Sequence, residues 1–490
     1  MIETFPAARY TETVLAVNFA DAQKHFLDAL MELHFAHGVM LAEQGMLSKD
    51  EVREIFGGLQ RIDRAALANA GYDGSVEDFF FHVERELTRT CDPHAAAKLH
   101  TARSRNDIDI TLYRMRIREE LLHVHTAVAE AARVLLDLAA RHLNTVMPAH
   151  THTQPAQPTT LAHYLCAAIE CFARDLTRLE AAYRTVNLNP LGACAITTTG
   201  FPIDRDRTSV LLGFEGLQVN SYGAIAAVDY IAESASAVMT SLLTLGKLVQ
   251  DLLTWSTVEY GFLRLSDGYV QCSSIMPQKR NPVALEHTRI LASRGLGEAQ
   301  GLFTAMHNTP FGDIVDSEDD LQPLIFLMFE DARRAWSLIG PALRGAAFNA
   351  EKLRERAGQH FLTVTELADT LVREEGIAFH DAHKLVSLAV NADRDDFRHE
   401  RIADCVIDNA ASVLGRALKT PRAKLLEALD PVYFVNIRKI PGGPAPEAVL
   451  AQLDTLNAHI DRANSWRASK YAGLSACRTA LQAAVKGLSQ

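Results

Sequence analysis

A long stretch without glycine most constrains the fold of this 490-residue chain, because glycine is absent from Ser75 to Leu191. Proline is also absent between Pro93 and Pro148. Apolar residues recur in this stretch at steps of three and four, which is the period of an amphipathic helix. The pattern predicts one helix over about residues 107–144. At roughly 1.5 Å per residue, such a helix is about 50 Å long.

Four more long helices are predicted from the same periodicity. They cover about residues 159–186, 224–259, 283 into the 300s, and 321–350. Several are apolar on more than one face, as in the segment AVMTSLLTLGKLVQDLL at 237–253. A helix that is apolar all round is buried inside a bundle or between subunits. The sequence therefore predicts an all-α, elongated helical bundle that oligomerises through its long helices.

The flanking segments carry shorter helices, so we expect three regions in total. Ser48 to Glu51 reads SKDE, a capping box that begins one helix, and Ser75 is expected to begin another. The predicted regions are an N-terminal helical domain at 1–110, a central long-helix bundle at 111–356, and a small C-terminal helical domain at 357–490.

Composition limits the class of partner. The net charge of −11 disfavours nucleic-acid binding as the main function, because neutralising phosphates requires an excess of Lys and Arg. The sequence contains no uncharged apolar run of roughly 18 residues, so no membrane span is predicted. The seven cysteines are scattered without a CxxC pair, and the first residues lack the pattern of a signal peptide. We therefore expect a cytoplasmic protein without nucleic-acid or membrane partners.

The segment HTARSRND, from His100 to Asp107, places several polar residues just before the longest predicted helix. Ser104 or Asn106 is positioned to cap that helix, and the N–H groups at a helix N-terminus favour bound anions. The alternative interpretation is a solvated helix start whose arginines form salt bridges. The segment alone does not separate the two.

The segment MPAHTHTQPAQP, at 147–158, places Thr151 and His152 in a turn fixed by three prolines. Histidine carries protons near neutral pH, and threonine can hold a carboxylate by a hydrogen bond. A histidine taken by itself is more often structural than catalytic, so this motif also needs its neighbours before it indicates a function.

The segment CSSIMPQKRNP, from Cys272 to Pro282, is predicted to be a loop because proline is excluded from helix and strand interiors. A serine hydroxyl acts as a base only with help, and a nearby cation and N–H donors supply that help. Glu286, at the start of the next predicted helix, is placed to orient a histidine from another chain. The alternative is a proline-bounded surface loop. The polar residues of the loop are Ser273, Ser274, Lys279 and Asn281.

Together these three segments resemble the signature regions of the fumarase/aspartase superfamily. SSIMPQKRNP resembles its hallmark loop GSSxMPxKxN, HTARSRND is similar to the HTGRSRNDQ of argininosuccinate lyases, and THTQPAQP is similar to their THLQxAQP. The resemblance extends over nearly the whole chain. Further matching segments are NPLGACA at 189–195, FPIDR at 201–205, EYGFLRLSD at 259–267, TELADTLVREEGIAFHDAH at 365–383 and IPGGPAPEAV at 440–449.

The resemblance implies a three-domain fold and a homotetramer in which long helices form a shared central bundle. It implies that three subunits contribute to each active site, which explains how motifs far apart in the sequence meet. The family reaction eliminates fumarate from an N-substituted aspartate without a metal or organic cofactor. We therefore expect cleavage of argininosuccinate to arginine and fumarate.

The resemblance also implies roles for individual residues. Ser273 is the expected base, and Lys279 and Asn281 are expected to stabilise the aci-carboxylate that forms. His152, oriented by Glu286, is expected to assist protonation of the leaving nitrogen. The loop at 266–282 is expected to close over the substrate, with Gly268 as a hinge. The expected substrate-binding residues are Ser104, Arg105, Asn106, Thr151, Ser274, Asn281 and Gln322.

The chain departs from the lyase pattern mainly at the leaving-group end. The lyase element YNKDLQEDK aligns with SEDDLQPLI, where Gln322 is kept, but Ser317 replaces the tyrosine and Ile325 the lysine. The run SEDD within it is interpreted as a helix cap. Val228 stands where the lyase element DAVSDRD has an arginine. Near the other motifs, Ala102 replaces a glycine, Ile108 a glutamine and Cys272 a glycine.

Two alternatives to argininosuccinate cleavage follow from these departures. One is the same elimination on another N-substituted aspartate or aminopolycarboxylate, as in ethylenediamine-disuccinate lyase. The other, more remote, is an inactive structural protein of the lens-crystallin type. The presence of Ser273, His152 and Lys279 weighs against the second.

Overall fold

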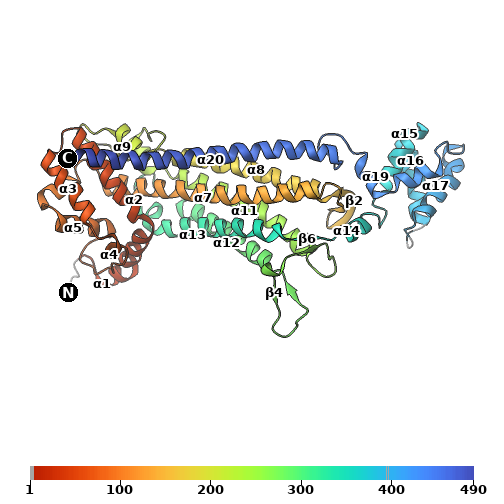
Figure 1. Ribbon diagram of the computed structural model, residues 1–490, viewed down its shortest axis with the longest axis horizontal. Helices are drawn as coiled ribbons and strands as arrows, with labels where there is room; N and C mark the ends of the chain where they lie inside the picture. The colour runs from red at the N-terminus through yellow and green to blue at the C-terminus, as the bar shows by residue number, and fades with distance from the viewer. Residues whose placement is uncertain (1–4, 393, 395–396) are drawn as a thin grey trace.

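The long predicted helices form and give the molecule an elongated shape (Figure 1). The computed structural model describes residues 5–392, 394 and 397–490. α20 (Pro446–Leu488) runs along the bundle and packs on α7 and α8. The all-α prediction is confirmed. The bundle consists of α7 (Arg105–Arg141), α8 (Leu161–Val186), α11 (Asp229–Trp255), α12 (Val283–Met306) and α13 (Gln322–Arg344).

Shorter elements flank the bundle. The N-terminal ones are α1 (Ala8–Tyr10), a π-helical turn (Thr11–Leu15), α2 (Ala16–Glu43), α3 (Lys49–Arg61), α4 (Arg64–Ala68), α5 (Phe79–Thr90) and α6 (Pro93–Lys98). Between the long helices lie α9 (Arg205–Leu212), α10 (Ser221–Ala226) and the 3₁₀ turns η2 (Asp267–Tyr269), η3 (Val315–Ser317) and η4 (Asp319–Leu321). After the bundle come α14 (Ala350–Ala357), α15 (Val364–Glu375), α16 (Phe379–Ala392), α17 (His399–Leu414), α18 (Arg422–Ala428) and α19 (Pro431–Asn436).

The strands form three separate antiparallel pairs. β1 (Val146–Thr151) pairs with β2 (Gln154–Thr160), β3 (Leu263–Arg264) with β6 (Ala347–Phe348), and β4 (Gln271–Cys272) with β5 (Arg280–Asn281). Each pair is short and attached to the helical scaffold, so the strands shape loops and do not form a sheet core.

Helix starts follow the capping signals in part. The backbone N–H of Ser48 donates to Glu51 over 2.8 Å, and the backbone N–H of Glu51 donates to the Ser48 hydroxyl over 3.3 Å, which confirms the predicted capping box. Ser104 occupies the N-cap of α7, and its backbone N–H donates to Asp107 over 2.8 Å. These contacts satisfy N–H groups that have no partner inside the helix.

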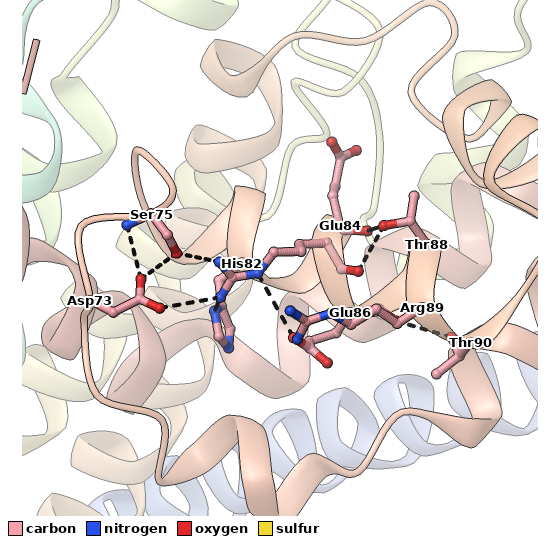
Figure 2. A network of polar contacts seen from close by, with 9 residues as sticks. Asp73, Ser75, His82, Glu84, Glu86, Thr88, Arg89 and Thr90 are labelled. Atoms are coloured by element: carbon pink, nitrogen blue, oxygen red, sulfur yellow. Dashed lines mark hydrogen bonds and ion pairs between the residues drawn. The ribbon is translucent and has the colours of Figure 1, made fainter.

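The prediction that Ser75 begins a helix is wrong. Its backbone N–H donates to Asp73 over 2.9 Å (Figure 2). Its hydroxyl contacts both Asp73 and Arg85. The serine therefore belongs to a turn closed by Asp73. Asp78 caps α5 instead, by accepting the backbone N–H of Phe81 over 2.9 Å.

Two of the predicted long helices differ from the prediction, one because it is divided and one because it ends early. The helix expected over 224–259 is divided, because Ala227 is extended (φ −81°, ψ 131°) between α10 and α11. The helix expected over 321–350 ends at Arg344, since the following residues leave to pair β6 with β3. Short extended connections interrupt an apolar pattern that continues past them.

The buried apolar residues form a large core, a small core and a minor cluster of Val146, Ala357 and Val435. The large core joins α2 and α3 to the bundle and to α20, including Val449, Leu453 and Ile460. The small core lies within α15–α18 and includes Leu367, Leu371, Ala382, Leu385, Ile402, Val406 and Leu425. Thus α20 packs with the bundle although its sequence falls in the region predicted as 357–490. The predicted domain boundaries stay a prediction.

Across the described ranges, none of the helices has an apolar stretch long enough to cross a membrane.

Candidate active site

The three sequence motifs lie in different parts of the single chain. HTARSRND stands at the start of α7, and the β1–β2 hairpin with Thr151 and His152 lies beyond its other end (Figure 1). α7 has 37 residues. At roughly 1.5 Å per residue, the two motifs are therefore about 55 Å apart along the helix. The β4–β5 loop projects from the side of the bundle (Figure 1).

The predicted residues at the start of α7 are held by hydrogen bonds within the chain. The Ser104 hydroxyl donates to Asn106 Oδ1 over 3.0 Å. Asn106 Nδ2 donates to the Ala195 carbonyl over 3.2 Å and to Asp313 Oδ2 over 2.7 Å. The amide that we expect to bind a substrate carboxylate therefore faces a carboxylate of the protein itself.

Arg105 also has partners inside the chain. Its Nη1 lies 2.7 Å from Asp78 Oδ2 and 3.4 Å from Glu77 Oε1, and its Nη2 lies 3.8 Å from Asp109 Oδ2. The positive charge of the predicted substrate-binding arginine is thus shared among three acids. A substrate carboxylate would compete with them for it.

Further carboxyl groups surround Arg105. Tyr113 donates from its hydroxyl to Asp319 Oδ1 over 3.1 Å. Burial raises the pKa of Glu318 to about 8, and a hydrogen bond with Asp313 adds to the rise. Burial also raises the pKa values of Asp109 and Asp319. We call the following five residues the carboxylate cluster: Asp78, Asp109, Asp313, Glu318 and Asp319.

The segment SEDD is not the helix cap that the sequence predicts. It forms η3 and η4, and α13 begins after Leu321 without a side-chain cap. The reason is that Glu318 and Asp319 turn their side chains to Asp313 and Tyr113 instead of to backbone N–H groups of α13. The sequence alone does not indicate that Glu318 and Asp319 lie near Arg105, because Arg105 is far away along the chain.

The lyase-like element at 317–325 has lost its cationic side chain. Ile325 is buried in the large core at 1% exposure, and the Ser317 hydroxyl donates to the Ile314 carbonyl over 3.1 Å. Gln322 is also 1% exposed. Its Nε2 donates to the Glu318 carbonyl over 3.3 Å, while its Oε1 is buried without a hydrogen-bond partner.

The β1–β2 hairpin presents the predicted histidine at its tip. Thr151 pairs with Gln154, so His152 and Thr153 form a two-residue turn. Both have left-handed φ values, 51° and 63°. Such turns favour Asn and Gly, and a β-branched residue there is strained. The hairpin exposes Thr151 and His152 to solvent.

The hallmark loop is closed at its base by β4 and β5. Cys272 pairs with Arg280, and Arg280 is fixed by Asp267 at 2.6 Å and by the Leu265 carbonyl at 3.0 Å. At the tip, the Ser273 hydroxyl oxygen accepts the backbone N–H groups of Met276 over 3.2 Å and of Ile275 over 3.4 Å. Two N–H donors aimed at this oxygen lower the cost of negative charge on it.

The remaining predicted residues are accessible. Ser274 and Lys279 are exposed on the hallmark loop, Asn281 is half-buried on β5, and Glu286 is exposed in the first turn of α12. Gly268 lies in η2 with open space where a Cβ would project. Within the described residues, no hydrogen bond or ion pair links Asn106, His152 and Ser273. One chain therefore holds three separate parts of the predicted site.

Sequence reasoning missed one supporting residue besides the carboxylate cluster. Asp107 is fully buried, and its Oδ2 accepts the backbone N–H groups of Gly192 over 2.8 Å and of Cys194 over 2.9 Å. This contact joins the HTARSRND and NPLGACA segments. Among the described residues, no group of three or more His, Cys, Asp or Glu side chains is arranged to hold a metal ion.

Comparison with known proteins identifies relatives over nearly the whole chain. Residues 28–297 match the family described as Lyase, and residues 361–436 match the family described as Argininosuccinate lyase C-terminal. The chain is 40% identical to argininosuccinate lyase 2 of Agrobacterium fabrum, over 98% of this chain and 97% of the relative. It is 36% identical to argininosuccinate lyase of Methanoculleus marisnigri, over 93% and 92% of the two chains.

Solved structures agree with the fold. A variant of EDDS lyase with bound fumarate superposes with a TM-score of 0.88 at 33% identity, covering 99% of this chain and 96% of the other. The class II fumarase of Schistosoma mansoni has the same fold, with a TM-score of 0.68 at 15% identity over 87% of this chain and 92% of the other.

Proposed function

The chain belongs to the argininosuccinate lyase family, and from this premise we propose that it cleaves argininosuccinate to arginine and fumarate. The observation that carries the proposal is similarity over 98% of the chain to an argininosuccinate lyase, with the three motif segments present. The reaction is a carbon–nitrogen bond cleavage.

In the proposed mechanism, Ser273 removes the proton from the carbon next to a substrate carboxylate. The electrons of that C–H bond move onto the carboxylate, and Lys279 and Asn281 stabilise the resulting aci-carboxylate. The carboxylate then reforms, the carbon–carbon double bond of fumarate appears, and the C–N bond breaks. The leaving nitrogen takes a proton with the assistance of His152, which Glu286 orients. The N–H donors of Ile275 and Met276 support ionisation of Ser273.

We further propose a homotetramer whose active sites each take residues from three subunits. Support comes from the 37-residue α7, which separates Asn106 from His152 by about 55 Å in one chain. Apolar side chains exposed on the long helices also support it, namely Leu243 at 56%, Ile290 at 54% and Leu327 at 37%. A cytoplasmic location is part of the proposal, and the seven unpaired cysteines are consistent with it.

Mixed oligomers test the shared site. Asn106→Ala and His152→Ala are each expected to abolish fumarate release when produced alone. When the two variants are co-expressed, some sites receive intact residues from both, so activity returns. Co-expressed protein that is no more active than either variant would contradict a shared site.

The reaction itself is tested by following fumarate absorbance with argininosuccinate as substrate. Ser273→Ala is expected to lower turnover by about a thousandfold or more, because it removes the base. Normal melting behaviour of the variant shows that the fold is kept. If wild-type protein releases no fumarate and Ser273→Ala changes nothing measurable, the crystallin-like alternative replaces the proposal.

The second candidate is elimination from another N-substituted aspartate, as in EDDS lyase. Two observations favour it: the TM-score of 0.88 to EDDS lyase, and the absence of a lysine at Ile325. If the protein turns over aminopolycarboxylates faster than argininosuccinate, this second candidate is the correct function.

A further inference from the structure

A cavity of about 550 Å³ lies at one end of the bundle, beside the β1–β2 hairpin. It is lined by both strands of the hairpin, by α8, by the last turns of α11 and by the segment that begins in α19. Sites for small ligands typically measure roughly 300–1,000 Å³. The predicted catalytic and substrate-binding residues, all of which the structure describes, do not line it. The cavity therefore has room for a small ligand outside the predicted site.

One wall of the cavity carries an acid without a cationic partner. Asp251, on α11, accepts the hydroxyl of Tyr164 over 2.6 Å, and within the described residues it forms no ion pair. Arg289 donates to the adjacent Gln250 over 2.8 Å instead. Burial lowers the pKa of the neighbouring His150 below its ordinary 6.5, so this imidazole is uncharged at neutral pH. The negative charge of Asp251 is therefore left uncompensated.

Aromatic rings line the cavity near this acid. The rings of Tyr164 and Trp255 have centroids 4.8 Å apart, and the ring of Tyr260 lies 6.4 Å from that of His150. A guanidinium or ammonium group gains both from a carboxylate and from the faces of aromatic rings, and guanidinium also stacks on them. This end of the cavity suits an organic cation.

An arginine lines the same cavity just after α19. Arg438 Nη1 lies 2.8 Å from Glu366 Oε2 and donates to the Phe434 carbonyl over 2.7 Å. Glu366 also pairs with Arg373, so two arginines share one carboxylate. In the described part of the chain, Nη2 and Nε of Arg438 have no hydrogen-bond partner. These N–H groups are available to a carboxylate.

The two charged side chains line one cavity without pairing with each other. Asp251 and Arg438 both belong to the described residues, and no ion pair joins them. A ligand that carries both charges satisfies both, whereas a simple cation or anion leaves one of them unused. The lining also includes Met147, Ala167 and Pro444, which suit a chain of methylene groups. An amino acid with a cationic side chain combines these features.

We propose that this cavity is a second binding site, separate from the catalytic one, for a free amino acid with a cationic side chain. The cation lies against Asp251 and the aromatic rings, and the carboxylate is bound by Arg438. Arginine, the product of the proposed reaction, has this chemistry. Thr153 also lines the cavity, so an occupant contacts the hairpin that carries His152. The inference goes beyond the proposed elimination and does not depend on it.

Calorimetric titration of the full-length protein with L-arginine tests the site. Ala167 lies exposed on α8 in the cavity wall, so Ala167→Trp fills the cavity without disturbing the core. We expect this variant to bind one arginine fewer per chain than the wild type, and Asp251→Asn to bind it at least about tenfold more weakly at this site. Ala472→Trp, on an exposed face of α20 outside the cavity, is the matched control and should bind like the wild type.

Two analogues test the chemical class in the wild-type protein. Agmatine lacks the carboxylate that Arg438 is expected to bind, and citrulline lacks the positive charge expected at Asp251. Each should bind at least about tenfold more weakly than arginine at the site that Ala167→Trp removes. Equal affinity for all three compounds would overturn the assignment to cationic amino acids.

The outcomes separate this inference from the proposed function. Arginine bound only at the catalytic site would give the same number per chain in the wild type, Ala167→Trp and Asp251→Asn, and this result would overturn the second site. Asp251→Asn hardly changes side-chain volume, so it gives the answer even if Ala167→Trp melts at a lower temperature. Fumarate release from argininosuccinate is measured separately, and its absence would overturn the proposed elimination alone.

Discussion

Asn106 Nδ2 donates a hydrogen bond to Asp313 Oδ2 over 2.7 Å. The amide that we expect to bind a substrate carboxylate is therefore already bonded to a carboxylate of the protein. The second N–H of this amide is used as well, by the Ala195 carbonyl at 3.2 Å. A substrate carboxylate therefore has to displace Asp313. Affinity for fumarate reports on this competition, because fumarate lacks a leaving group.

Asp313→Ala is expected to tighten fumarate inhibition by about three- to tenfold, the worth of a typical hydrogen bond that no longer has to be broken. The inhibition constant of fumarate in the elimination assay measures it, and direct binding of fumarate by titration calorimetry measures the same change in a variant that has no activity. In an Asn106→Ala background the same substitution should have no such effect. Equal tightening in both backgrounds would show that Asp313 acts through charge alone.

Glu318 predicts a pH-dependent stability. Burial and its hydrogen bond with Asp313 raise its pKa from the ordinary 4.5 to about 8, so the folded chain keeps a proton that the unfolded chain loses. Stability is fully present below about pH 4.5 and falls as pH rises towards 8. Glu318→Gln removes this loss, so its melting temperature should fall less between pH 5 and pH 8. Asp316→Asn should follow the wild type.

The hairpin turn predicts a stabilising substitution. Thr153 holds a left-handed φ of 63°, which is unfavourable for a β-branched residue and free of cost for glycine. Thr153→Gly should raise the free energy of unfolding by about 1 kcal/mol, measured by denaturant titration. Gln154→Gly, at a neighbouring extended position, should lower it. A loss of stability in both variants would contradict strain at Thr153.

The small core depends on one buried carboxylate. Glu375 Oε1 accepts the backbone N–H groups of Lys419 over 2.8 Å and Thr420 over 2.7 Å, and its Oε2 pairs with Arg416 at 2.6 Å. Burial raises the pKa of Glu375, but hydrogen bonds from Thr420 and Arg416 outweigh it and bring the pKa to about 2. This stabilisation is present above about pH 4.5 and lost as pH falls towards 2.

Glu375→Gln should therefore destabilise the C-terminal helices by about 2–3 kcal/mol at neutral pH, measured by denaturant unfolding. The difference from wild type should shrink in acid. Asp404→Asn is the control, because it breaks an ion pair whose side chains are 45% and 53% exposed. It should cost less than about 1 kcal/mol. A similar loss in both variants would contradict a special role for Glu375.

The long helices were predictable because their signal is local. Periodicity and the absence of glycine and proline place α7 within a few residues, and proline spacing identifies the hallmark loop. The breaks were not predictable. Ala227 is extended although the apolar pattern around it continues. Ser75 is a good candidate for a helix cap, but its backbone N–H donates to Asp73 in a turn instead.

The carboxylate cluster was not predictable for a different reason. It joins Asp78 and Asp109 to Asp313 and Asp319, which come together only when α7 packs beside α13. An acid in the sequence reads as a solvated charge unless its distant neighbours are known. The proposed site has the same property at a larger scale, because its parts lie at opposite ends of one helix.

The length of α7 fixes the distance between the two motifs at its ends. Each added or removed residue would shift everything beyond it by roughly 1.5 Å and turn it by about 100°. Inserting a single alanine in the middle of α7 would therefore swing the His152 hairpin to another side of the molecule while leaving Asn106 in place. The length of α7 therefore sets the length of the whole molecule. We expect insertions and deletions in related sequences to be much rarer in α7 than in the loops around it.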